Sequence, residues 1–116
     1  MSLKIYEWEH EKFEDLYNIH LLPEVRETII YRLAKRFDIK LSAIGFTLNK
    51  NGQTWFNHRY IELPKQTCPL GLVLHELTHL YSFQKYGDGH HGRVFKKSLI
   101  KLMIETRFEL NKLLKI

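Results

Sequence analysis

The sequence predicts one α+β domain in which helices pack on a small antiparallel sheet. Hydrophobic residues make up 44% of the 116 residues, and this composition and length suit a single packed core rather than two domains of ordinary size. Apolar residues recur at helical spacing before residue 40 and after residue 69, whereas β-favouring residues fill the segment between them. We therefore expect one domain over 1–116, with a core over 22–116 and an N-terminal extension or helix over 1–21.

Four helices are predicted from apolar periodicity and from residues typical of helix ends. A first helix covers about 9–19, and a second begins at Pro23, because proline is favoured in the first helical turn. The run after Pro69 is apolar on almost all sides, which indicates a buried central helix that ends at Gly87-Asp88-Gly89. The last helix is predicted from about Gly92 to Leu114.

Two strands joined by a turn are predicted between the second helix and the central helix. Residues 41–48 are apolar and β-favouring, Asn49-Lys50-Asn51-Gly52 is a strong turn signal, and Gln53 to Leu63 forms the partner segment before Pro64. We therefore expect an antiparallel hairpin. The segment from Gln53 to Leu63 is the candidate edge strand beside the central helix.

The central helix carries the motif His75-Glu76-Leu77-Thr78-His79. Histidines four residues apart lie on one helix face with about 5 to 6 Å between their Cβ atoms, so both imidazoles can bind one tetrahedral ion. Glu76 remains free to act as a general base on water whose pKa the cation lowers to about 7. The motif therefore predicts one zinc ion, with His75 and His79 as ligands and Glu76 as the catalytic residue.

The third zinc ligand is less firmly predicted. A catalytic zinc site needs three protein ligands and an open position, whereas a structural site needs four ligands. We favour His91, because it stands at the entrance of the last helix, where the chain turns back over the central helix. His90, Asp88 and Glu105 remain open as alternatives.

Charge and cysteine content limit the partners. A single cysteine, Cys68, excludes an internal disulfide and a four-cysteine zinc site, and the net charge of +5 favours acidic partners. No segment has the length and apolar character of a membrane span or a secretory signal, so we expect a soluble, cytoplasmic protein without membrane contact. One side of the last helix is basic, with Arg93, Lys96, Lys97, Lys101, Arg107, Lys112 and Lys115.

This basic side has two interpretations. We favour an ordinary solvated helix face, opposite a face that packs in the core. The alternative is contact with the phosphates of a nucleic acid through Arg93, Lys96, Lys97 and Lys101.

The order HELTH, a short glycine-rich loop and then HGRVF resembles the SprT-like zincin metallopeptidases in their minimal single-domain form. The resemblance covers residues from about 22 to 105, and HExxH is its most specific element. It implies a zincin-like fold in which His75, His79 and His91 bind zinc and Glu76 is the general base. Many members append a zinc ribbon, and this sequence lacks the cysteines for one.

These observations together predict a zinc-dependent metallopeptidase that hydrolyses peptide bonds with zinc-activated water and Glu76 as the base. Its substrate would be an intracellular protein or peptide, and association with DNA is compatible with the charge. Two alternatives stay open. One is a basic nucleic-acid-binding module with a structural zinc, and the other is a hydrolase of non-peptide amides on the same scaffold.

Overall fold

The computed structural model describes residues 2–48 and 51–114. Asn49 and Lys50 of the predicted turn, and Lys115 of the predicted basic face, lie outside these ranges. In chain order the elements are α1 (Ser2–Lys12), α2 (Glu14–Tyr17), β1 (His20–Leu21), α3 (Pro23–Arg36), β2 (Ala43–Thr47), β3 (Gln53–Trp55), β4 (Tyr60–Pro64), β5 (Cys68–Pro69), α4 (Leu70–Tyr86) and α5 (Arg93–Leu114).

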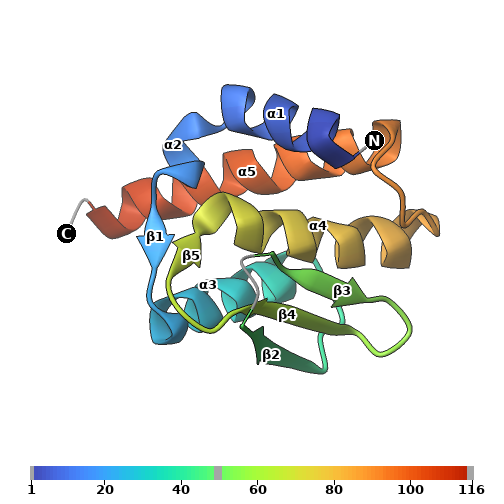
Figure 1. The fold of residues 1–116 in the computed structure, drawn as a ribbon, viewed down its shortest axis with the longest axis horizontal. Coiled ribbons are helices and arrows are strands. Elements are labelled where there is room, and N and C mark those ends of the chain that lie inside the picture. Colours follow the sequence, from blue (N-terminus) through green and yellow to red (C-terminus); the bar gives the residue numbers. More distant parts are fainter. Residues whose placement is uncertain (1, 49–50, 115–116) are drawn as a thin grey trace.

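Helix α4 occupies the middle of the molecule. Figure 1 shows α1, α2 and α5 on one side of it, and α3 with the three-stranded sheet on the other. Every residue from Leu70 to Ser82 is buried, which explains why this segment is apolar on almost all sides. Helix α4 therefore places the polar residues of this segment, the HExxH motif among them, inside the molecule.

The three long helices agree with the sequence prediction, whereas the first helix differs. Pro23 begins α3 in its first turn, and Gly87 ends α4 with a φ of 71°, a left-handed conformation that glycine adopts without steric cost. In place of one helix over 9–19, the chain forms α1 and α2, which are separated at Phe13. The break points the side chains of Phe13 and Leu16 into the core.

The predicted antiparallel hairpin is wrong. Strand β2 pairs in parallel with β4, and β3 pairs antiparallel with β4, so the sheet is mixed with the order β2-β4-β3. The predicted strand over 53–63 is interrupted by a turn at 56–59, in which Arg59 adopts a φ of 53°. Its second half, β4, becomes the central strand, and only its first half, β3, lies at an edge. The two-residue strands β1 and β5 form a separate antiparallel pair.

One hydrophobic core joins both ends of the described chain. Ile5, Phe13 and Leu16 from the first two helices belong to the same buried cluster as Leu77 of α4 and Phe95 of α5. The segment before residue 22 therefore contributes side chains to the core. Within the described residues, no helix combines the length and the apolar character needed to cross a membrane.

Arg26 of α3 fixes the loop that leads into α4. Its side chain is only 1% exposed, and its guanidinium donates hydrogen bonds to the backbone carbonyls of Pro64 and Gln66 and to Sγ of Cys68. A buried guanidinium is costly unless its N–H groups find acceptors, and these three acceptors come from one short segment. The Arg26 guanidinium thus connects α3 to the segment before α4. Cys68 is a buried thiol, and burial raises its pKa.

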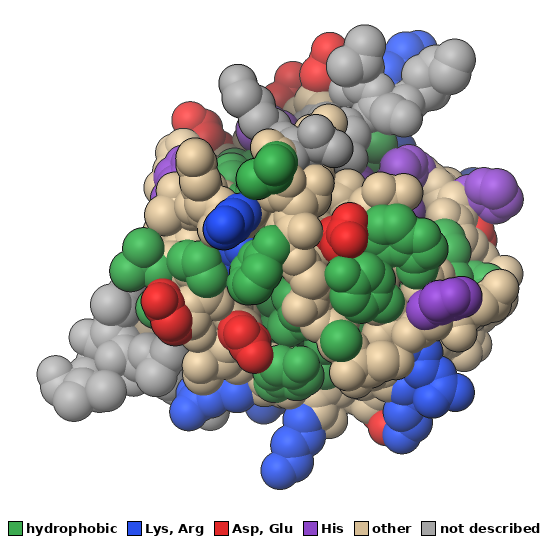
Figure 2. Space-filling view, turned by 60° about the horizontal axis from the view of Figure 1, so that its bottom comes forward, with side chains coloured by type: hydrophobic (Ala, Val, Ile, Leu, Met, Phe, Trp, Pro, Cys, Tyr) green, Lys and Arg blue, Asp and Glu red, His purple; other side chains and the backbone are tan. Residues whose placement is uncertain are grey.

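The face formed by α3 and the three-stranded sheet carries exposed apolar side chains. Figure 2 shows them gathered in the middle of this face, with lysine and arginine side chains along its lower border. The large exposed apolar residues of these elements and their flanks are Leu22, Val25, Tyr31, Phe46 and Leu48.

Candidate metal centre

Three imidazole rings converge between α4 and the start of α5. Nε2 of His91 lies 3.1 Å from Nε2 of His75 and 2.8 Å from Nε2 of His79. Two nitrogen ligands of a tetrahedral zinc ion stand about 3.3 Å apart, given Zn–N bonds of about 2.0 to 2.1 Å. The two distances to His91 are somewhat shorter than this, and the ligand nitrogens of His75, His79 and His91 all lie within 4.8 Å of one another, so this group can hold a metal ion.

The loop between α4 and α5 turns His91 toward the helix. Gly87 reverses the chain, and the carboxylate of Asp88 accepts a hydrogen bond from the backbone N–H of His90 at 2.9 Å. Ser82 Oγ donates to the Asp88 carbonyl at 2.6 Å, which ties the loop to the end of α4. Gly89 passes so close to Phe56 that an added Cβ would lie 3.0 Å from its ring. These contacts leave His90 exposed and His91 half-buried.

The structure separates the four candidates for the third ligand. His91 joins the other two imidazoles, whereas His90 points to solvent. Asp88 is engaged within the loop, and Glu105 forms an ion pair with Arg36 at 2.8 Å between α5 and α3. Within the described ranges, no fourth His, Cys, Asp or Glu side chain joins the group. A metal ion bound by this group would keep an open position, as catalytic sites do.

Phe95 supports all three rings from the first turn of α5. Its ring centroid lies 5.0 Å from that of His75, 4.7 Å from His79 and 4.9 Å from His91. Phe95 is fully buried, so its ring is held in place by the core. The last residue of the HGRVF element thus forms an apolar floor beneath the three imidazoles.

The electrostatic environment favours the neutral form of His79 and of His91, and a neutral imidazole is the form that binds metals. Burial lowers the pKa of His79 to about 3, with further contributions from His75 and His91. Burial also lowers the pKa of His91, and the charge of His75 acts in the same direction. An interaction with the backbone of Gly89 raises the pKa of His79, but the effect of burial is larger. Among the described residues, no group lies within full hydrogen-bond geometry of the buried Nδ1 of His79.

Glu9 is a site residue that the sequence analysis missed. It is fully buried, and its carboxylate lies 2.6 Å from Nδ1 of His75, on the side of the ring opposite Nε2. A signal for it was present, since Ile5, Glu9 and Phe13 are four residues apart, which places an acid in the middle of an apolar helix side. Both apolar neighbours are buried in the structure.

Glu76 is held by the edge strand β3. Thr54 Oγ1 donates a hydrogen bond to Oε1 of Glu76 at 2.6 Å and also lies 3.2 Å from its backbone carbonyl. A Cβ at Gly52 would lie 2.7 Å from Cγ of Glu76, so glycine leaves room for this side chain. Burial raises the pKa of Glu76, while the hydrogen bond from Thr54 opposes that shift.

The predicted basic face of α5 is divided among several neighbours. Lys96 lies over the ring of Trp8, Lys101 Nζ lies 3.3 Å from the Tyr81 hydroxyl, and Arg107 pairs with Asp15. Arg93 and Lys97 are exposed. This arrangement does not show whether α5 binds a nucleic acid, so nucleic-acid binding stays a prediction.

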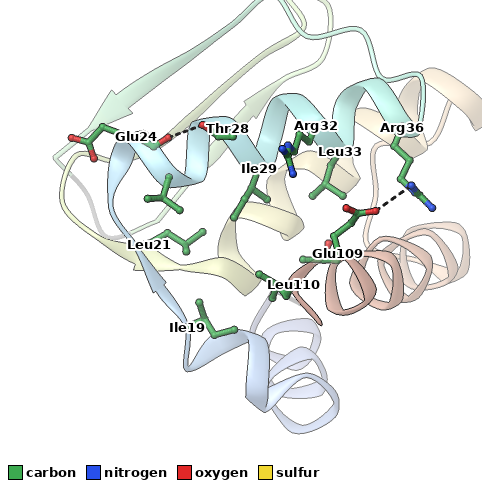
Figure 3. A pocket seen from close by; sticks show the side chains of 12 residues that line it. Ile19, Leu21, Glu24, Thr28, Ile29, Arg32, Leu33, Arg36, Glu109 and Leu110 are labelled. Carbon is green, nitrogen blue, oxygen red and sulfur yellow. Dashed lines mark hydrogen bonds and ion pairs between the residues drawn. The ribbon is translucent and has the colours of Figure 1, made fainter. Parts of the chain in front are cut away.

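A separate apolar groove lies away from the histidines. It has a volume of about 970 Å³ and runs between α3, β1 and the C-terminal half of α5. Figure 3 shows Leu21, Ile29, Leu33 and Leu110 in its wall, and Arg36 with Glu109 at its rim. None of the residues that line it belongs to the histidine group, so the groove and the candidate metal centre are distinct features.

Comparisons with models of known protein families, with curated proteins and with solved structures find no match to this chain. The resemblance to SprT-like zincins therefore stays a prediction from the HELTH and HGRVF elements.

Proposed function

We propose that this protein is a zinc-dependent metallopeptidase with a zincin-like site. One observation carries the proposal: three buried or half-buried imidazoles of the HExxH helix and the following loop present their Nε2 atoms to one point. Imidazole ligands suit zinc, and three of them with an open position are typical of catalytic sites. A bound zinc ion would supply a Lewis acid that polarises the scissile carbonyl and acidifies water.

Glu76 would take the proton from the attacking water and pass it to the leaving amine. Its carboxylate is 3% exposed and follows His75 directly on α4. The raised pKa makes it a stronger base than an exposed glutamate, which suits proton transfer near neutral pH. Thr54 donates to one carboxylate oxygen and so leaves the other available to accept a proton.

The peptide substrate would pair with strand β3. This strand lies at the edge of the sheet, next to α4, and an extended peptide can add to such an edge through backbone hydrogen bonds. Thr54, which holds Glu76, belongs to the same strand. Substrate binding and orientation of the base would then depend on one element, and such an arrangement would bring the scissile bond near the carboxylate.

Glu76→Gln tests this proposal. The substitution keeps the shape of the side chain and removes its ability to accept a proton, so hydrolysis of an unfolded protein such as casein should fall by about 10²- to 10⁴-fold. Zinc content, measured by elemental analysis, should stay at one ion per chain. Glu27→Gln on the exposed side of α3 is the matched control and should keep both properties.

Two results would contradict the proposal. In one, the zinc-loaded wild-type protein cleaves no peptide bond; in the other, Glu76→Gln retains full activity. Hydrolysis of small non-peptide amides in the absence of protein cleavage would instead favour the alternative hydrolase.

A further inference from the structure

The side of the metal centre that faces α1 contains a buried carboxylate between two hydrogen-bonding partners. Glu9 Oε2 lies 2.6 Å from Nδ1 of His75, and Glu9 Oε1 accepts a hydrogen bond from the Tyr17 hydroxyl at 2.7 Å. The side chain of Glu9 is 0% exposed. A carboxylate removed from water is costly unless both oxygens find donors, and these two residues provide one donor each.

The local packing is arranged to hold this carboxylate. Gly71, in the first turn of α4, has no side chain, and a Cβ there would overlap the Tyr17 ring at 2.4 Å. The absence of a Cβ lets Tyr17 lie directly against α4, and the His10 ring stacks on the Tyr17 ring at 3.9 Å between centroids. The hydroxyl of Tyr17 is thereby fixed next to Glu9, which lies eight residues earlier in the chain.

We propose that Glu9 is a positioning residue of the metal centre, which fixes the ring of His75 so that its Nε2 atom faces the ion. A carboxylate only accepts hydrogen bonds, so Nδ1 of His75 carries the proton that lies between the two groups. In the neutral form of the ring, the lone pair of Nε2 is then the one that would bind the ion, and this atom lies 3.1 Å from Nε2 of His91. This inference rests on the metal site of the proposed function.

The contrast with His79 supports a specific role. No carboxylate contacts Nδ1 of His79 among the described residues, and the backbone of Gly89 is the group that acts on this ring, whereas Nδ1 of His75 lies 2.6 Å from the carboxylate of Glu9. Ligand histidines that donate their second N–H to a carboxylate are more basic and better oriented, and loss of such a partner typically costs 10- to 100-fold in metal affinity. Glu9 also brings a negative charge close to a site that would hold a divalent cation.

The contact has a second consequence, because Glu9 comes from α1. If docking of α1 strengthens metal binding, then metal binding strengthens the docking of α1 by the same factor, since coupling between two equilibria is reciprocal. Helix α1 would therefore be a component of the metal centre as well as of the core.

Glu9→Gln tests the inference, with Glu7→Gln on the exposed side of α1 as the matched control. Zinc affinity is measured by competition with a chromophoric chelator, and the absorption of the Co²⁺-loaded protein reports the geometry around the metal. We expect Glu9→Gln to weaken zinc binding by about 10- to 100-fold and to change the Co²⁺ spectrum. Glu7→Gln should match the wild type in both measurements.

A second variant guards against general unfolding. Tyr17→Phe keeps the carboxylate and removes one of its donors, so zinc affinity should fall in the same direction but less than in Glu9→Gln. Hydrogen exchange should also show that zinc slows exchange of the α1 amides in the wild type, and that it slows them less in Glu9→Gln.

The outcomes separate this inference from the proposed function. If the wild-type chain binds no zinc, both are wrong. If it binds zinc and Glu9→Gln binds equally tightly with an unchanged Co²⁺ spectrum, the role of Glu9 is refuted and the metal site stands. Lower stability of the metal-free Glu9→Gln protein with unchanged zinc affinity would also refute it, since that result indicates a purely structural role.

Discussion

Phe95→Ala is the most direct test of how the core supports the candidate metal centre. The ring of Phe95 is 0% exposed and lies within 5.0 Å, centroid to centroid, of all three imidazoles. Removing a buried phenylalanine ring loses its transfer free energy and leaves a cavity, at a cost of about 3 to 5 kcal/mol. The free energy of unfolding of such a domain is only about 5 to 15 kcal/mol, so this is a large fraction of it.

Urea unfolding of the metal-free protein measures this loss. With a slope of about 2 kcal/mol per molar urea, the midpoint should fall by about 2 M. Phe108→Ala on the same helix is the matched control: its side chain is 54% exposed, so its substitution should change the free energy of unfolding by no more than about 0.5 kcal/mol. Zinc affinity should also fall in Phe95→Ala, because the three rings lose their common support.

A stability loss below about 1 kcal/mol would refute the idea that Phe95 is the rigid floor of the site. The cavity left by a phenylalanine ring in a tightly packed core lowers the free energy of unfolding by more than that. Equal losses for the two phenylalanines would refute it as well. A full stability loss with unchanged zinc affinity would show that the ring supports the core without supporting the ligands.

Three further predictions concern the site itself. His91→Ala should abolish most zinc binding and His90→Ala should leave it unchanged, as elemental analysis can show; the reverse result would move the third ligand by one residue. Gly52→Ala should displace the side chain of Glu76 and lower peptide hydrolysis while zinc content persists, because the new Cβ would lie 2.7 Å from Glu76 Cγ; full activity would exclude this close contact. Lowering the pH from about 6.5 to about 3 should destabilise the metal-free protein by about 1.4 kcal/mol per pH unit through His79. In this pH range His79 is protonated in the unfolded chain and stays neutral in the folded protein, whose lowered pKa is about 3. The raised pKa of Glu76 acts in the opposite sense, so the difference between wild type and His79→Gln in acid unfolding isolates this contribution; identical pH profiles would contradict it.

The sequence predicts those parts of the fold that depend on local chemistry. Apolar spacing, Pro23 and Gly87 are sufficient to place α3 and α4, because these residues act within one or two turns of the helix they begin or end. Strand pairing depends on distant partners instead. Nothing in the residues of β2 indicates that it pairs in parallel with β4, because β3 comes between these two strands in the sequence. The turn at 56–59 also lacks the Asn-Gly signal that precedes β3.

The site divides in the same way. The HELTH motif fixes two imidazoles and a carboxylate on one helix, so their relation follows from helical geometry alone. The sequence favours His91 over His90 without excluding His90, because the choice depends on the hydrogen bonds of Asp88 within the loop. Glu9 is 66 residues away from His75, and only tertiary packing brings them together.

The guanidinium of Arg26 has a consequence for how the chain can vary in length. It donates hydrogen bonds to three acceptors within residues 64–68, so an inserted or deleted residue in this segment would shift the point at which α4 begins. Each residue of such a shift rotates a helix by about 100°, which would carry the HELTH residues away from the loop that follows them. Natural variants and engineered insertions should therefore avoid this segment, and lysine, which lacks the planar fork, should be a poor replacement for the arginine.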